Sequence, residues 1–287
     1  MNAIRVLTAR ILRIGSPLLM LALIPAVGAP PLKKYVLLSA HVEQDLLSNG
    51  VGTDQTTEVT NHYDQQGNLV DTLIVGSGNF DQVQTTTYVN DANGDPITST
   101  VEVDNDGDGD VDLTAISTFS YDSQGKRIAI DQLVYNDADP LTIMRHTSFG
   151  YDAQGNLTSV VTASDIAVLG LFDGVVDQIT TVENTWDSNG RLLQTVTRAD
   201  LNGDGDTLDQ GESVETRVNT FDGKDRIASA LITAVRMNGG VPILSTATAT
   251  FTYQGHGLLT ELQTIADTNA DGTIDQIVTT TNTWGKK

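Results

Sequence analysis

The chain has 287 residues, with 37 acidic and 16 basic side chains, a formal net charge of −21 and no cysteine. The lack of cysteine excludes disulfides and thiolate metal sites, and the strong acidity argues against a nucleic-acid partner. Because the acids cluster between runs rich in Val, Ile, Leu and Thr, the composition indicates an ordered protein rather than a disordered acidic chain.

The first 29 residues have the layout of a signal peptide. Three arginines and no acid precede an apolar run from Ile14 to Val27, which ends in small residues. Glycine and proline interrupt this run, so it fits a membrane-spanning helix of about 20 apolar residues poorly. We therefore expect export with cleavage after Gly28 or Ala29. The mature chain would have no membrane span and would be secreted, displayed on the cell surface, or periplasmic in a bacterium.

A short motif recurs along the rest of the chain. It consists of an aromatic residue, Asp, two variable residues, Gly and a polar residue, and successive copies are 27 to 35 residues apart. Such a period is typical of repeat architectures. Nearly intact copies begin at Tyr63, Tyr121, Tyr151 and Trp186, and degenerate copies begin at Asn90, Phe221, Tyr253 and Trp284.

Each unit predicts two strands joined by a tight turn. Apolar residues and threonines alternate from Ile243 to Tyr253, which is the period of a strand with one wetter face. The Asp-x-x-Gly segment then closes an antiparallel hairpin, since glycine supplies a positive φ and Asp bonds its own backbone. The prediction is an all-β antiparallel meander of about seven stacked hairpins in a curled or spiralling sheet. A β-propeller and a closed barrel are the alternatives.

The segment of residues 30–50 precedes the first unit. The spacing of Tyr35, Leu38, Val42 and Leu46 predicts a short helix that caps the exposed first edge of the sheet. The expected organisation is therefore a signal peptide over residues 1–29, a lead or cap over 30–50 and a repeat domain over 51–287.

Three connections between units carry carboxylates and amides at alternate positions, followed by glycine. Oxygens at loop positions 1, 3 and 5 converge on calcium when a glycine at position 6 turns the backbone. We therefore predict calcium as the cofactor and the following ligand candidates: Asp104, Asp106, Asp108, Asp110 and Asp112 in the first loop; Asp200, Asn202, Asp204, Asp206, Asp209 and Glu212 in the second; and Asp267, Asn269, Asp271, Thr273 and Asp275 in the third.

The loops differ from EF-hands. Position 12, which supplies a bidentate Glu in an EF-hand, is Ala115, Gly211 or Val278 here. Asp112 and Asp275 at position 9 are the expected closing ligands of the outer loops. An insertion leaves the closure of the middle loop open.

Two families share parts of these patterns. The Tyr-Asp-x-x-Gly units over residues 51–287 resemble the YD repeats of Rhs and teneurin-type proteins, whose hairpins build a spiralling shell. Units of that family are nearer 20 residues, and no toxin or autoproteolysis segment follows here. The string from Asp104 to Leu113 resembles the calcium loops of FG-GAP or VCBS repeats in β-propellers, and it is EF-hand-like in its first half.

No catalytic motif is present, and the four histidines share no local pattern, so we expect a non-enzyme. The predicted function is an exported calcium-binding β-repeat protein that acts as a surface or extracellular binding or structural module. Its partners would be calcium and a glycan or cell-surface protein. An outer-membrane β-barrel and a secreted carbohydrate-active enzyme are the alternative functions.

Overall fold

The computed structural model describes residues 35–45, 55–78, 82–136, 142–167, 172–254 and 257–286. Its regular elements are sixteen strands: β1 (Tyr35–Asp45), β2 (Gln55–Tyr63), β3 (Leu69–Gly78), β4 (Gln82–Asn90), β5 (Pro96–Asp104), β6 (Leu113–Tyr121), β7 (Arg127–Asn136), β8 (Thr142–Tyr151), β9 (Leu157–Ile166), β10 (Gln178–Trp186), β11 (Leu192–Asp200), β12 (Ser213–Phe221), β13 (Ile227–Asn238), β14 (Val241–Tyr253), β15 (Leu259–Asp267) and β16 (Gln276–Lys286).

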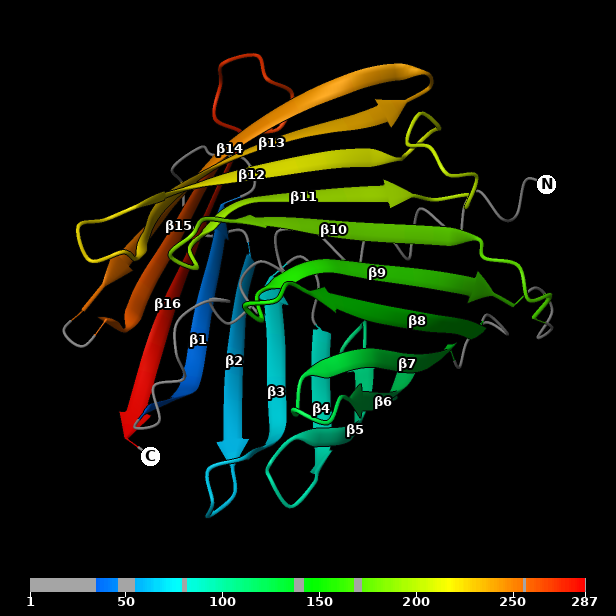
Figure 1. The fold of residues 1–287 in the computed structure, drawn as a ribbon, viewed down its shortest axis with the longest axis vertical. Coiled ribbons are helices and arrows are strands. Elements are labelled where there is room, and N and C mark those ends of the chain that lie inside the picture. The colour runs from blue at the N-terminus through cyan, green and yellow to red at the C-terminus, as the bar shows by residue number, and fades with distance from the viewer. Residues whose placement is uncertain are drawn as a thin grey trace. The chain divides into compact units, whose positions relative to one another are not determined.

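All sixteen strands form one antiparallel meander that closes on itself. Each strand pairs with its neighbours in sequence, and β1 pairs with β16 to complete a closed barrel. In Figure 1 the blue first strand lies beside the red last strand. The predictions of an all-β antiparallel meander and of a closed barrel as an alternative are confirmed. The curled or spiralling stack of hairpins is not found, because closure pairs the two edges that such a sheet leaves open.

The helix expected within residues 30–50 is wrong. Residues 35–45 form β1, which pairs with β2 on one side and β16 on the other. Ala40 and Val42 are buried while His41 between them is not, which is the period of a strand. The segment therefore completes the wall instead of covering an edge. Leu46 and the predicted signal peptide over residues 1–29 lie outside the described residues.

The repeated motif forms one kind of five-residue turn. In the turn after β6, Asp122 Oδ1 accepts hydrogen bonds from the backbone N–H groups of Gln124 and Lys126, at 2.8 and 2.9 Å. Gly125, at φ +77°, donates its N–H to the carbonyl of Asp122. A side chain with a Cβ rarely adopts this φ, which explains the preference for Gly; in the turn after β12, Asp225 takes this place at φ +59°.

A β-bulge accompanies each of these turns. The register between β6 and β7 shifts after Ser120, so that Tyr121 pairs with Arg127 and Ile128 is the extra residue. The same shift precedes the first motif residue of the other units. The bulge places the aromatic residue and the first residue of the next strand on the same face of the wall.

The two faces of the wall differ in burial. On β13, Ala230 and Ile232 are 0% and 8% exposed, whereas Leu231 between them is 52% exposed. On β6, Ala115 is buried and Ile116 is 43% exposed. Because side chains crowd together on the concave side of a closed barrel, the buried set forms the inner face and the exposed set the outer face.

Candidate functional site

The turns and the acidic loops lie at opposite ends of the barrel. In an antiparallel meander every second connection is at the same end, so the five-residue turns share one end, which we call the turn end. The three acidic loops join β5 to β6, β11 to β12 and β15 to β16, and they share the other end, the loop end. The structure thus brings all the predicted ligands to one rim of the barrel.

The first acidic loop is folded around Asp104. The Oδ1 of Asp104 accepts the N–H of Gly107 at 2.6 Å, and its Oδ2 accepts the N–H of Gly109 at 2.9 Å. Asp112 closes the loop, since its Oδ2 accepts the N–H of Asn105 at 2.7 Å. Asp110 is exposed and donates its N–H to Asp108.

Three carboxylates of this loop gather in the geometry of a cation site. One oxygen from each of Asp104, Asp106 and Asp108 lies within 4.8 Å of the others. Oxygens bound to one calcium ion at about 2.4 Å are at most about 4.8 Å apart, so this set of side chains fits the ion. The other calcium ligands would come from Asp112, backbone carbonyls or water.

The middle loop has the same hydrogen-bond pattern as the first loop, and two of its carboxylates, Asp200 and Glu212, are buried. Asp200 accepts the N–H groups of Gly203 and Gly205 at 2.6 and 2.8 Å. Glu212 is fully buried, and its two oxygens accept the N–H groups of Leu201 and Asp209. Glu212 therefore occupies the closing position that Asp112 has in the first loop. Asn202 donates to both Asp204 and Asp209, while Asp206 accepts the N–H of Leu208.

The third loop has the same hydrogen-bond pattern, with Asp267 at its start and Asp275 at its end. Asp267 accepts the N–H of Gly272 at 2.7 Å, and Asp275 accepts the N–H and hydroxyl of Thr268 at 2.8 and 2.7 Å. Asn269 donates its side-chain amide to Asp271. The N–H and hydroxyl of Thr273 hold the pKa of Asp271 below its usual value, because hydrogen bonds favour the charged carboxylate. Thr273 therefore acts as a donor to Asp271 here.

The structure adds a fourth loop, between β9 and β10, to the three predicted from the sequence. Asp165 Oδ2 accepts the N–H of Gly174 at 3.1 Å, and Asp177 Oδ2 accepts the N–H of Ile166 at 2.7 Å. These are the bonds that Asp104 and Asp112 make in the first loop. The signal in the sequence was the second half of the motif, Asp173-Gly174-x-x-Asp177, separated from Asp165 by an insertion.

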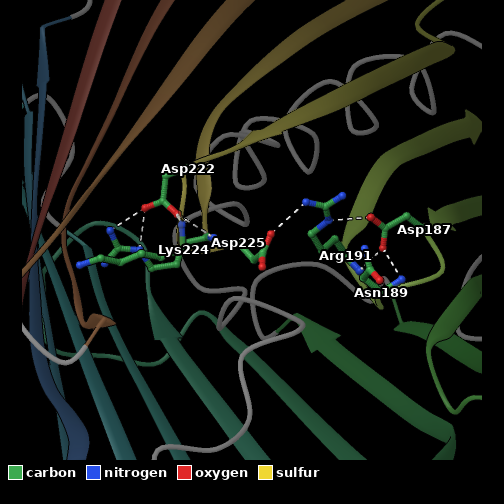
Figure 2. Close-up of polar contacts among 7 residues, drawn as sticks. Asp187, Asn189, Arg191, Asp222, Lys224 and Asp225 are labelled. Carbon is green, nitrogen blue, oxygen red and sulfur yellow. Dashed lines mark hydrogen bonds and ion pairs between the residues drawn. The ribbon is translucent and has the colours of Figure 1, made fainter.

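At the turn end, charged side chains link neighbouring hairpins. Figure 2 shows Arg191 between Asp187 of its own turn and Asp225 of the next, at 2.6 and 3.0 Å. The guanidinium of Arg191 also lies over the ring of Phe221, 5.0 Å from its centroid. Arg226 repeats the arrangement with Asp222 and the ring of Tyr253. The last residue of the turn thus contacts the following unit where it is Lys126, Arg191 or Arg226, whereas Asn68 and Asn156 donate to the Asp of their own turn.

The histidines lie on the outer face rather than in a catalytic group. His41 contacts Glu58, His62 contacts Asp71 and His146 contacts Asp131, each pair lying directly across two adjacent strands. His256 lies outside the described residues. On the same face, Arg198 pairs with Glu183 at 2.6 Å. These cross-strand polar contacts stabilise strand pairing.

No family model matches this sequence, and no characterised protein matches it significantly. Among solved structures, a porin-like protein from Bacteroides uniformis ATCC 8492 is 12% identical, with a TM-score of 0.49, over 87% of this chain and 96% of that one. A porin-like protein from Bacteroides vulgatus ATCC 8482 is 10% identical, with a TM-score of 0.39, over 87% and 99%. At these TM-scores the likeness does not establish a shared fold. No helix in the described part of the chain is long and apolar enough to cross a membrane.

The closed barrel corrects the predicted function. An open repeat scaffold exposes a broad sheet face and two edges to partners, but here β1 and β16 pair over ten residues and leave no free edge among the described strands. The prediction of a repeat protein that acts as a surface or extracellular binding or structural module is therefore wrong, and calcium binding by its loops is a separate prediction. The motif copies are instead the hairpins of a single barrel.

Proposed function

We propose that this chain is a β-barrel of the outer-membrane type. The observation that carries this proposal is the closure of sixteen antiparallel strands of 9 to 13 residues into one barrel. Membrane barrels have even strand numbers and strands of about 9–11 residues, and barrels of about 16 strands are wide enough for an aqueous channel.

The connections support the same proposal. Every turn between paired strands at the turn end has five residues, whereas the connections at the loop end reach twelve residues, between Asp200 and Ser213. Outer-membrane barrels have short periplasmic turns and longer extracellular loops. The turn end would therefore face the periplasm and the four Asp-rich loops the outside of the cell.

The outer face favours a second candidate, a barrel that stands in water and encloses a ligand. It carries the ion pair of Arg198 with Glu183 and the contact of His146 with Asp131. A lipid-facing Lys or Arg at the bilayer midplane costs about 2–4 kcal/mol, so membrane barrels rarely carry one there.

Fractionation of a Gram-negative host that expresses the full chain separates the two candidates. An outer-membrane barrel stays with the outer-membrane fraction after an alkaline carbonate wash and needs detergent for release. Recovery in the soluble periplasm would contradict the proposal and support the second candidate. The Leu231→Asp variant sharpens the test, because Leu231 is exposed on the outer face. In a membrane barrel this charge reduces insertion, whereas a barrel in water tolerates it.

A further inference from the structure

Charge is segregated between the two faces of the barrel wall. The strand registers place four arginines on the inner face, with Glu215 as the sole inner carboxylate among the described strand residues. The arginines are Arg127, which pairs with Tyr121; Arg145, which pairs with Gln132; Arg217, which pairs with Ile232; and Arg236, which pairs with Ser213. None of the four forms an ion pair in the described part of the chain.

This inner face is opposite in sign to the whole chain, whose net charge is −21. Apart from Glu215, the acids of the described strands lie on the outer face or at strand ends, and the other described acids lie in the turns and loops. A wall lined by one sign of charge raises the local concentration of the opposite ion, and low-dielectric surroundings strengthen the effect. The inner wall is therefore electropositive in an acidic protein.

Arg145 is held in place by a ladder of neutral groups. Its Nη1 donates to Gln132 Oε1 at 3.1 Å, and Gln132 Nε2 donates to Ser117 Oγ at 3.1 Å, across β8, β7 and β6. A guanidinium has five N–H donors, and this ladder uses one of them. The ladder orients the positive charge without neutralising it.

Arg127 is positioned in a different way on the neighbouring strand. Its guanidinium lies over the rings of Phe119 and Tyr121, with centroids at 4.8 and 5.9 Å. Its Nε is buried and has no hydrogen-bond partner in the described structure. A buried donor without a partner costs about 1–3 kcal/mol, and an anion that accepts from it removes that cost. Cation–π contacts fix the group but leave its donors free.

Arg217 lies on β12 and is restrained by amide and aromatic contacts. Its Nε donates to Asn219 Oδ1 at 2.9 Å, and its guanidinium lies 5.4 Å from the centroid of Phe251. Glu215, two residues away on the same strand, interacts electrostatically with Arg217, but the two side chains form no ion pair within 4.0 Å. The hydrogen bonds and ring contacts of Arg127, Arg145 and Arg217 in the described structure are thus all to neutral groups.

We propose that the barrel interior takes anionic solutes, such as small molecules with a carboxylate or phosphate group, and that Arg127, Arg145 and Arg217 contact them. Guanidinium groups suit both anions because their planar donors match paired oxygens. This inference rests on the closed barrel of the proposed function, although it does not depend on whether the barrel lies in a membrane.

The test uses the purified full barrel in planar bilayers with a KCl gradient. We expect a reversal potential that shows preference for chloride over potassium. The Arg145→Gln and Arg127→Gln variants should each lower the permeability ratio by roughly twofold at low salt, while Arg145→Lys retains most of it. Arg198→Gln is the matched control, because it removes the same charge from the outer face and should leave the ratio unchanged. A pore without anion preference, or an equal effect of Arg198→Gln, would overturn the inference alone.

A barrel that forms no pore contradicts the outer-membrane proposal, and a second readout then decides the inference. Equilibrium dialysis of the water-soluble barrel with pyrophosphate measures anion binding directly. Binding that Arg145→Gln weakens and Arg198→Gln leaves intact would support the inference. Absence of binding, or equal binding by all variants, would overturn it.

Discussion

The hydroxyl of Tyr121 donates a 2.7 Å hydrogen bond to the carbonyl oxygen of Pro96, at the start of a strand in the preceding unit. The aromatic residue of the motif makes this bond in five other units. Tyr63, Tyr151, Tyr253, Trp186 and Trp284 donate to the carbonyls of Leu37, Arg127, Ile227, Leu157 and Leu259, respectively. The aromatic side chain therefore links consecutive hairpins by a hydrogen bond, in addition to its apolar contacts.

Tyr121→Phe removes this donor and keeps the ring. We expect a loss of about 1 kcal/mol in the free energy of unfolding, because the carbonyl of Pro96 loses its side-chain donor. Urea unfolding followed by circular dichroism measures the change. Tyr135→Phe is the control, since Tyr135 lies exposed on the outer face, and an equal loss there would refute the role given to Tyr121.

Asp222 makes the turn end sensitive to acid. Its pKa is lowered from 3.8 to about 2, first by the side chain of Arg226 and then by backbone N–H groups. A carboxyl whose pKa is depressed by folding stabilises the barrel above its unfolded pKa, and this contribution is lost as the pH falls from about 4 to about 2. Asp222→Asn should lower the thermal midpoint at pH 5 and flatten its pH dependence in that window.

Asp110→Asn provides the comparison for this experiment. The carboxylate of Asp110 accepts no hydrogen bond within the described structure, so its removal should leave the acid-dependent loss of stability in place. Melting curves at half-unit pH steps distinguish the variants. Parallel pH profiles for the wild type and Asp222→Asn would rule out the stabilising role of the Asp222–Arg226 pair.

Alanine substitutions at two glycines of the middle loop distinguish the cost of backbone strain from the cost of a steric clash. Both Gly203 and Gly205 have positive φ, at +72° and +95°. A Cβ on Gly203 would lie 2.4 Å from the carbonyl oxygen of Val176 in the β9–β10 loop, whereas one on Gly205 would meet open space. Gly205→Ala should cost about 1–2 kcal/mol from φ strain alone, and Gly203→Ala should cost clearly more. Equal losses would mean that the two loops do not touch there.

Calcium binding by the acidic loops stays a prediction from the sequence. An ion that binds only the folded barrel raises its stability by about 2.7 kcal/mol at a hundred times its dissociation constant. We expect the thermal midpoint to be higher in millimolar calcium than in excess EDTA, and Asp108→Asn to reduce the difference. Magnesium at the same concentration is the ionic-strength control. Equal midpoints in calcium and EDTA would reduce the loops to hydrogen-bonded acidic turns.

The sequence predicts the local structure of this protein far better than its closure. The Asp-x-x-Gly turns and the alternation along strands such as Ile243–Tyr253 depend on neighbouring residues, so a motif search finds them. Pairing of β1 with β16 joins residues more than 230 positions apart, and the apolar spacing of Tyr35, Leu38 and Val42 fits a helix as well as a strand. Nothing local distinguishes an open sheet from a closed one.

The candidate site was likewise predicted only where its residues are adjacent in sequence. The loops that begin at Asp104, Asp200 and Asp267 are contiguous and were predicted. The loop that begins at Asp165 was missed, because an insertion interrupts its motif. The inner arginines were missed because they are single residues on separate strands, and only the registers place Arg127, Arg145 and Arg217 on one face.

The closure of the barrel is tested most directly by a disulfide between its first and last strands. The chain has no cysteine, so a Glu43→Cys, Thr279→Cys double variant has no competing thiols. These residues are direct partners across β1 and β16, and direct antiparallel partners have Cα atoms about 4.5–5.5 Å apart, which suits a disulfide. We expect nearly complete intramolecular cross-linking under mild oxidation, seen as a reductant-sensitive shift in denaturing gels, and none for Glu43→Cys with Thr248→Cys on β14. Failure of the 43–279 pair to cross-link in the folded protein would contradict a closed barrel.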